Sequence, residues 1–336
     1  MTSRVFANPL RATGGAGPRV SRAELDAVAA FAPHRPATPL HDARAIADAL
    51  GLAALLVKDE THRWGLNAFK ITGVSYALDT WSRTSDLNNS PGAITCASAG
   101  NHGRAVARAA RERGLPCRVF LPADALPARV HAIRGEGADV VQIDGSYEDA
   151  IDRAAAYAAE SGALLVSDTA PPGDPEITQL IMRGYTKVLS EAAAAWNQPP
   201  DVIVVQGGVG GLVGAAAAWI RSMLPSATLI AAEPEGSACL KASAAAGRLS
   251  ILPATAATSM VCLRCAAPSA VAWPFIAAGV DGFVTVTDAE AASAVSMLAG
   301  AGIDSGASGA CGLAALAAIA PELRGRGAMI IVTEGP

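Results

Sequence analysis

Residues 202–211 read Val-Ile-Val-Val-Gln-Gly-Gly-Val-Gly-Gly, and this stretch decides the fold class. The uncharged run Val202–Gln206 is typical of a buried strand, and the glycines after it lead into a helix predicted over Leu212–Met223. A strand that passes through a short loop into a helix is the repeating unit of α/β proteins with parallel sheets.

The glycine loop is also a candidate anion site. Glycines allow backbone N–H groups to crowd around an anion, and the start of the following helix adds positive potential. The loop lacks the Lys-Ser/Thr of a nucleotide P-loop and the full Gly-x-Gly-x-x-Gly of a dinucleotide site, so a single phosphate fits it best. The alternative is a tight turn that binds nothing. We expect the phosphate to be held by Gly207, Gly208, Val209, Gly210 and Gly211.

Strands and helices alternate along the rest of the chain, which predicts two open, mostly parallel, three-layer αβα domains. We expect a large domain from residues 1–71 and 191–336, and a small domain from residues 72–190. Thr287 and Glu290 form a capping box that opens another helix. Strands are predicted at 52–57, 93–97, 117–121, 140–143, 164–167, 202–206, 228–232, 283–286 and 329–333, and helices at 69–82, 103–113, 128–134, 147–160, 176–195, 212–223 and 309–320.

Composition narrows the choice of partners and location. The 336 residues carry 26 Lys and Arg against 30 Asp and Glu, without a basic block, which disfavours nucleic acids and anionic membranes. We see neither a membrane-spanning run nor the apolar core of a signal peptide, so a cytoplasmic location is expected. The six cysteines lack zinc-site spacing, and no metal site is predicted. We expect buried thiols, with a disulfide from Cys239 to the 262–265 segment as the alternative.

Lys70 closes the stretch Asn67-Ala68-Phe69-Lys70. An isolated lysine at the start of a helix is most often solvated. Here Phe69 and Ile71 make its surroundings apolar, and burial helps a lysine to lose its proton before it forms a Schiff base. Together with the phosphate loop, this lysine indicates a phosphorylated aldehyde cofactor bound to Lys70, and therefore an enzyme that acts on amino acids.

The stretch Ser98-Ala99-Gly100-Asn101-His102-Gly103 also joins a strand to a helix. Its hydroxyl and N–H groups suit a substrate carboxylate, and the Asn101 amide could hydrogen-bond a ring oxygen of the cofactor. Loops at the carboxyl ends of parallel strands line the ligand sites of open α/β sheets. A histidine in this place is more often a helix-start residue than a general base. The predicted substrate-binding residues are Ser98, Ala99, Gly100, Asn101 and His102.

These three segments resemble the fold-type II pyridoxal-phosphate enzymes, the group that includes tryptophan synthase β and threonine dehydratase. From about residue 40 to the C-terminus the chain resembles one branch of that group, the diaminopropionate ammonia-lyases. The segments that carry this resemblance are Gly65–Lys70, Leu165–Ala170, Glu233-Pro234-x-Gly236, Ser259–Trp273, Ser305-Gly306-x-Ser308-Gly309 and Thr333-Glu334-Gly335.

The resemblance implies a role for each matching residue. Lys70 would be the Schiff-base lysine, Asn101 would bond the phenolic oxygen of pyridoxal 5'-phosphate, and the glycine loop would hold its phosphate. Thr333 would face the pyridine nitrogen, and Asp168 would be the acid-base carboxylate, although a loop or strand-end cap is the plain alternative for Asp168. A homodimer is implied as well. One departure is Ala99, where the family has an aspartate that is associated with the D-isomer.

The implied reaction is α,β-elimination of ammonia from 2,3-diaminopropionate, with the L-isomer favoured, to give pyruvate and ammonia. A carboxylate such as Asp168 could pair with the β-ammonium of that substrate. Ala99 instead favours a serine/threonine dehydratase or a hydroxyaspartate dehydratase. A β-replacement synthase of the same fold and a cofactor-binding regulatory protein without turnover stay open.

Overall fold

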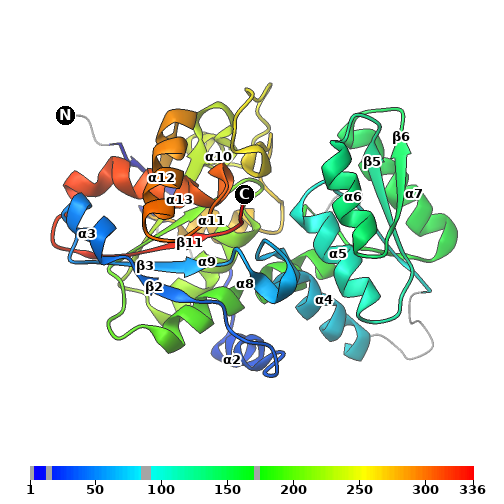
Figure 1. Cartoon of the computed structure of the whole chain (residues 1–336), viewed down its shortest axis with the longest axis horizontal. Helices are drawn as coiled ribbons and strands as arrows, with labels where there is room; N and C mark the ends of the chain where they lie inside the picture. Colours follow the sequence, from blue (N-terminus) through cyan, green and yellow to red (C-terminus); the bar gives the residue numbers. More distant parts are fainter. Residues whose placement is uncertain (1–3, 13–16, 85–91, 170–174) are drawn as a thin grey trace. The chain divides into compact units, whose positions relative to one another are not determined.

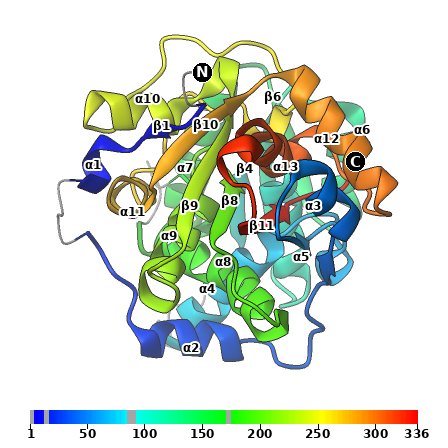
Figure 2. The same cartoon turned by 90° about the vertical axis from the view of Figure 1, so that its left-hand side faces the viewer.

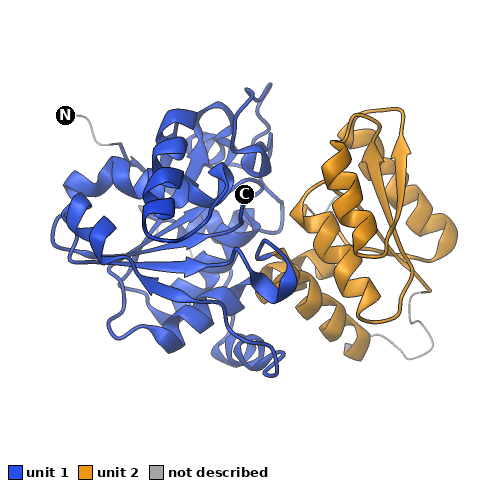
Figure 3. Cartoon of the chain, viewed as in Figure 1, with its two compact units in different colours: residues 1–69, 185–336 blue, residues 70–184 orange. Residues whose placement is uncertain are grey.

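The computed structural model describes residues 4–12, 17–84, 92–169 and 175–336 (Figure 1). The chain divides into two compact units, Met1–Phe69 with Tyr185–Pro336 and Lys70–Gly184 (Figure 3). We call them unit 1 and unit 2. Helix α8 (Pro175–Ala195) begins in unit 2 and ends in unit 1.

Unit 1 is built on a seven-stranded sheet in the order β1-β10-β9-β8-β11-β3-β2. The edge strands β1 and β2 run antiparallel to their neighbours, and all other pairs are parallel. Every residue of β8 is buried, as expected for an uncharged central strand. The strands are β1 (Phe6–Ala7), β2 (Leu40–Asp42), β3 (Ala54–Asp59), β8 (Val202–Gln206), β9 (Thr228–Pro234), β10 (Gly282–Val286) and β11 (Gly327–Val332).

Helices cover both faces of this sheet (Figure 2). Helices α12 (Asp288–Gly300) and α13 (Ala307–Ile319) lie on one face, and α9 (Gly211–Met223) and α11 (Trp273–Gly279) lie on the other. Alanine and glycine make up six of the thirteen residues of α9 and eight of the thirteen of α13, which lets both helices approach the strands closely. The other helices of this unit are α1 (Pro9–Ala12), α2 (Arg22–Ala30), α3 (Arg44–Leu50) and α10 (Cys239–Ala246), with 3-10 turns η1 (Arg63–Gly65), η3 (Glu235–Ser237), η4 (Val261–Leu263) and η5 (Ala320–Glu322).

Unit 2 has a four-stranded parallel sheet in the order β6-β5-β4-β7. Helix α7 packs on one face, and α5 and α6 lie on the other (Figure 1). Its elements are α4 (Lys70–Thr84), β4 (Ile94–Ala97), α5 (Asn101–Arg111), β5 (Cys117–Pro122), α6 (Pro127–Gly135), β6 (Asp139–Ile143), α7 (Tyr147–Ser161) and β7 (Leu164–Leu165).

Each sheet contains a point where the strand order reverses. In unit 1 the chain moves from β8 to β9 and β10 on one side, and β11 then joins the other side of β8. In unit 2 the chain moves from β4 to β5 and β6, and β7 then joins the other side of β4. Ligands of open α/β sheets bind beyond the carboxyl ends of strands at such points. A ligand site is therefore expected in the loops that follow β8, β11, β4 and β7.

Most predicted elements are confirmed within a few residues, and the α/β class is correct. The bounds of β8 match, and the capping box of α12 is present, because Thr287 Oγ1 accepts from Glu290 N–H and Glu290 accepts from Thr287 N–H. The sequence prediction missed the elements before residue 52, where strands are short and helix α3 has no side-chain cap.

Three boundaries were wrong in ways that matter for the site. The strand predicted at 164–167 covers only Leu164–Leu165, which frees the following residues for the loop that carries Asp168. Thr333 lies just after β11 rather than inside it. Asn101 and His102 form the first turn of α5 rather than a loop, because Gly100 serves as its N-cap.

The remaining expectations concern cysteines and membranes. All six cysteines lie in described residues and are thiols, but Cys262 is exposed and Cys265 is only partly buried, so the prediction that all are buried was wrong for these two. Within the described parts of the chain, no helix combines the length and apolarity needed to cross a membrane. Ala170, the last residue of the segment around Asp168, lies outside the described residues.

Candidate active site

In unit 1 the glycine loop joins β8 to α9 as predicted. Gly207 N–H donates to the carbonyl of Ala232 (2.9 Å), and Gly210 has a left-handed φ of +91° that favours glycine. A Cβ on Gly208 would lie 2.9 Å from Cys265 Sγ, so a larger residue does not fit without a shift. No described side chain caps α9. The first N–H groups of a helix have no acceptors within it, and here they suit a phosphate.

Thr333 lies at the same edge of the same sheet. It follows β11, which is the parallel neighbour of β8, and its side chain is buried. Its Oγ1 accepts a hydrogen bond from Gln206 Nε2 (3.0 Å), and its carbonyl accepts from Phe69 N–H (3.2 Å). Phe69 directly precedes Lys70, the predicted Schiff-base lysine. This hydrogen bond therefore ties the residue before Lys70 to Thr333, which is predicted to face the pyridine ring.

In unit 2 the structure brings Lys70 and Asp168 together. Lys70 is the first residue of α4, and its Nζ donates to Asp168 Oδ2 at 2.8 Å. The two side chains are 20% and 19% exposed, so water screens this pair only in part. Burial alone would raise the pKa of Asp168, but the charges of His102 and Lys70 and the hydrogen bond from Lys70 outweigh it and hold that pKa below its usual value. Asp168 is therefore a carboxylate at neutral pH.

His102 approaches the same carboxylate from the first turn of α5. Its Nε2 lies 3.0 Å from the carbonyl of Val166, and because a carbonyl only accepts, Nε2 carries the hydrogen. Its Nδ1 lies 3.8 Å from Asp168 Oδ2 and has no hydrogen-bond partner within the described residues. A proton on Nδ1 would point at Asp168, so the ring is placed to exchange a proton there. We expected His102 to be a helix-start residue rather than a general base. It lies in the first turn of α5, and its ring also approaches the carboxylate of Asp168.

The loop before α5 is compact. Ser98 Oγ accepts from Gly100 N–H at 3.3 Å, and a Cβ on Gly103 would lie 2.1 Å from the Ser98 carbonyl. No described side chain caps α5, so the first N–H groups of this helix are suited to an anion such as a substrate carboxylate. Ala97, His102, Tyr147, Ser167 and Asp168 line a pocket of about 10 Å³ in unit 2, enough for one water molecule.

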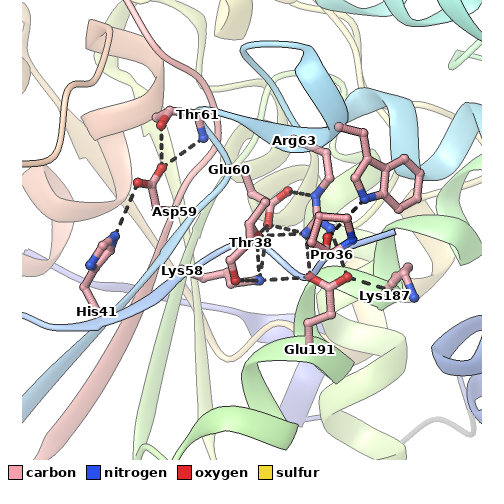
Figure 4. A network of polar contacts seen from close by, with 11 residues as sticks. Pro36, Thr38, His41, Lys58, Asp59, Glu60, Thr61, Arg63, Lys187 and Glu191 are labelled. Atoms are coloured by element: carbon pink, nitrogen blue, oxygen red, sulfur yellow. Dashed lines mark hydrogen bonds and ion pairs between the residues drawn. The ribbon is translucent and has the colours of Figure 1, made fainter. Parts of the chain in front are cut away.

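A buried polar network that the sequence analysis missed supports the segment before Lys70 (Figure 4). Arg63 is fully buried and donates to both carboxylate oxygens of Glu60 (2.6 Å each) and of Glu191 (2.9 and 2.7 Å). Lys58 Nζ donates to Glu191 (2.9 Å) and to Thr38 Oγ1 (2.6 Å). The signal was visible as charged residues at 58, 60 and 63, in and directly after an otherwise apolar strand.

This network surrounds a strained piece of backbone. Trp64, next to Arg63, has a φ of +50°, which is uncommon for a bulky residue. Such conformations persist where the surrounding structure fixes them. Gly335 N–H donates to the carbonyl of Asn67 (2.9 Å), which ties the end of the same segment to the C-terminal residues. The chain that leads to Lys70 is therefore held at both ends by unit 1.

Comparison with known proteins agrees with this chemistry. A family model described as "Pyridoxal-phosphate dependent enzyme" matches residues 32–335. Diaminopropionate ammonia-lyase of Salmonella typhimurium is 33% identical, over 80% of this chain and 72% of the relative. Serine racemase of Oryza sativa subsp. indica is 32% identical, over 81% of this chain and 76% of the relative. The structure of Escherichia coli diaminopropionate ammonia-lyase with an aminoacrylate–cofactor reaction intermediate superposes with a TM-score of 0.87 at 28% identity, covering 98% of this chain and 93% of that one.

Proposed function

The chain belongs to the pyridoxal-phosphate-dependent enzymes, in their diaminopropionate ammonia-lyase branch, and we propose that it eliminates ammonia from 2,3-diaminopropionate, favouring the L-isomer. It is a lyase, and its cofactor is pyridoxal 5'-phosphate. The products are pyruvate and two molecules of ammonia, because the aminoacrylate that follows β-elimination is hydrolysed with loss of its remaining amino group.

The residues present fit this cofactor. The buried hydroxyl of Thr333 has a donor, Gln206, but no acceptor for its own hydrogen among the described residues, and a pyridine nitrogen would be one. The uncapped start of α9 suits the phosphate held by Gly207–Gly211. We propose that Lys70 binds the aldehyde carbon and that Asn101 bonds the phenolic oxygen. When bound, the cofactor supplies a ring that accepts the electron pair left on the substrate α-carbon.

Asp168 carries the specificity in this proposal. Its depressed pKa keeps it negative, and a carboxylate forms a strong charge-assisted hydrogen bond with an ammonium group such as the β-ammonium of diaminopropionate. That ammonium leaves as ammonia and needs no further proton. The uncapped start of α5, with Ser98, Ala99 and Gly100 before it, would bind the substrate carboxylate.

Two chain groups can take the α-proton in this site. Lys70 Nζ and Asp168 Oδ2 are 2.8 Å apart, so a proton accepted by one could pass to the other when the Lys70 amine is free. His102 Nδ1, which lies 3.8 Å from the same oxygen, would share the charge of Asp168. The 2.8 Å contact between Lys70 and Asp168 is the observation that carries the proposal.

A panel of amino acids tests it. We expect pyruvate from L-diaminopropionate with two ammonia per pyruvate, and lower rates with the D-isomer, L-serine and L-threonine. Ala99 favours a second candidate, a serine dehydratase, because that loop then lacks the carboxylate found in the ammonia-lyase family. Serine yields one ammonia per pyruvate, so the stoichiometry separates the two reactions. Higher kcat/KM for serine than for L-diaminopropionate would overturn the first candidate.

We further propose that units 1 and 2 are the large and small domains of the enzyme, and that two chains form a homodimer in the cytoplasm. Light scattering on the purified protein would give twice the chain mass of 33.8 kDa for a dimer. A mass equal to one chain would contradict it.

A further inference from the structure

Gln206 lies between the two parts of the proposed cofactor site in unit 1. It is the last residue of β8, directly before the glycine loop, and its side chain is buried. Its Nε2 lies 2.8 Å from the carbonyl of Gly309, 2.9 Å from that of Ile331, 3.0 Å from Thr333 Oγ1 and 3.3 Å from the carbonyl of Ser308. The acceptors come from α13 and from the β11 strand and its end, so this amide joins three elements of unit 1.

The orientation of the Gln206 amide is fixed by these neighbours. Three of the four acceptors are carbonyl oxygens, which cannot donate, so the NH₂ group must face them. The reversed amide would place Oε1 against the same carbonyls. Gly312 leaves the space for Oε1, since a Cβ there would lie 2.9 Å from it. Oε1 itself has no hydrogen-bond partner among the residues described.

This orientation decides the direction of the hydrogen bond to Thr333. Because Gln206 Nε2 donates, Thr333 Oγ1 accepts, and the hydroxyl hydrogen of Thr333 is left for another partner. In the described part of the chain no acceptor is bonded to it. A buried donor without an acceptor is costly, so the site is complete only when an acceptor is present.

We propose that Gln206 is a positioning residue that makes Thr333 a hydrogen-bond donor toward the cofactor ring. The pyridine nitrogen then accepts that hydrogen bond with its lone pair and stays unprotonated. An unprotonated ring holds the α-carbon electron pair less well, which favours immediate loss of the β-amino group over return of the proton to the α-carbon. The inference rests on the proposed function, and in particular on Thr333 facing that nitrogen.

The first experiment measures the nitrogen directly and does not depend on turnover. The holoenzyme is loaded with pyridoxal 5'-phosphate carrying an isotopically labelled ring nitrogen, and its NMR resonance is followed against pH. We expect an unprotonated nitrogen in the wild type and a shift toward the protonated position at neutral pH in Gln206→Leu. Thr333→Val removes the donor and should give a shift of its own, and adding Gln206→Leu to it should change nothing further. If the resonance shift in the double variant equals the sum of the shifts in the two single variants, the proposal is overturned.

A second variant leaves the amide in place but moves it. Gly312→Ala puts a methyl group 2.9 Å from Gln206 Oε1, so the nitrogen resonance should shift in the same direction by a smaller amount. Gln142→Leu is the matched control, because Gln142 is exposed and, among the described residues, donates only to the carbonyl of Ala123. A wild-type resonance in both Gln206→Leu and Gly312→Ala, with a shifted one in Thr333→Val, would show that Gln206 positions nothing.

The second measurement follows the substrate. In deuterated water we compare two rates, the uptake of α-deuterium by unreacted L-diaminopropionate and the formation of pyruvate. The ratio of the first rate to the second should be about tenfold higher in Gln206→Leu than in the wild type, which is the effect of about one hydrogen bond. An unchanged ratio would overturn the proposal. Failure of the proposed function is recognised separately. If the wild type does not release ammonia from diaminopropionate but Gln206→Leu still shifts the resonance of the ring nitrogen, the role of Gln206 stands and diaminopropionate is rejected as the substrate.

Discussion

Lys70 Nζ donates a 2.8 Å hydrogen bond to Asp168 Oδ2 although 98 residues separate them in the chain. Asp168 follows β7 and Lys70 opens α4, so the pairing depends on β7 joining β4 at the point where the strand order of unit 2 reverses. The contact joins a lysine that can bind an aldehyde to a carboxylate that stays ionised.

Asp168→Asn should remove most turnover of L-diaminopropionate while the cofactor remains bound. The amide keeps the shape but loses the charge that we propose pairs with the β-ammonium and accepts a proton, so kcat/KM should fall about 100-fold or more. Pyruvate release and the visible absorbance of the bound cofactor are the two measurements. Asp144→Asn, an exposed change in the same unit, is the control. Steady-state pyruvate formation equal to that of the wild type would reject the role of Asp168.

The same pair makes the stability of the cofactor-free enzyme depend on pH. The pKa of Asp168 is lower in the folded chain than its unfolded value of about 3.9, so its ionised form stabilises the fold above that pH. The stabilisation is lost as the pH falls through the folded value. We expect the difference in unfolding free energy between wild type and Asp168→Asn to be constant from pH 7 to about pH 5 and to shrink below about pH 4. Denaturant titrations at each pH measure it, and a difference that grows on acidification would contradict the prediction.

Arg63 tests the network beneath the segment that leads to Lys70. Arg63→Met leaves the carboxylates of Glu60 and Glu191 buried without their strongest partner, and removal of one member of a buried ion pair costs about 3–5 kcal/mol. Arg22→Met is the matched control, because its pair with Asp26 is exposed and should contribute less than about 1 kcal/mol. Urea denaturation gives both values. Equal losses in the two variants would show that the network contributes little.

The parts of this protein that local sequence predicts are those with a local cause. The uncharged run of β8 and the Thr287–Glu290 capping box each follow from neighbouring residues, and both are present. Glycines mark the loop before α9 because backbone geometry and close packing require them there. These signals suffice for the fold class and for the position of the glycine loop between β8 and α9.

The contacts that the sequence does not predict join residues far apart in the chain, which the strand order and the packing of helices bring together. The sequence around Gln206 does not indicate that its Nε2 lies 3.0 Å from Thr333 Oγ1, because that contact forms only when β11 pairs with β8. Arg63 likewise gains Glu191 only when the helix α8 packs near the end of β3. The exposed thiol of Cys262 lies in the 3-10 turn η4, which the sequence analysis did not predict.

Ala99→Asp tests the origin of stereochemical preference. The resemblance to the ammonia-lyases implies an aspartate at this place, associated with the D-isomer, whereas the loop before α5 here holds Ala99. A carboxylate at position 99 adds a proton acceptor beside the start of α5, so turnover of D-diaminopropionate should rise roughly tenfold or more relative to the L-isomer. Ala99→Asn adds the same bulk without the base and should leave the ratio near that of the wild type. The ratio of kcat/KM values for the two isomers is the measurement. If the asparagine variant gains as much as the aspartate variant, loop shape rather than proton transfer sets the preference.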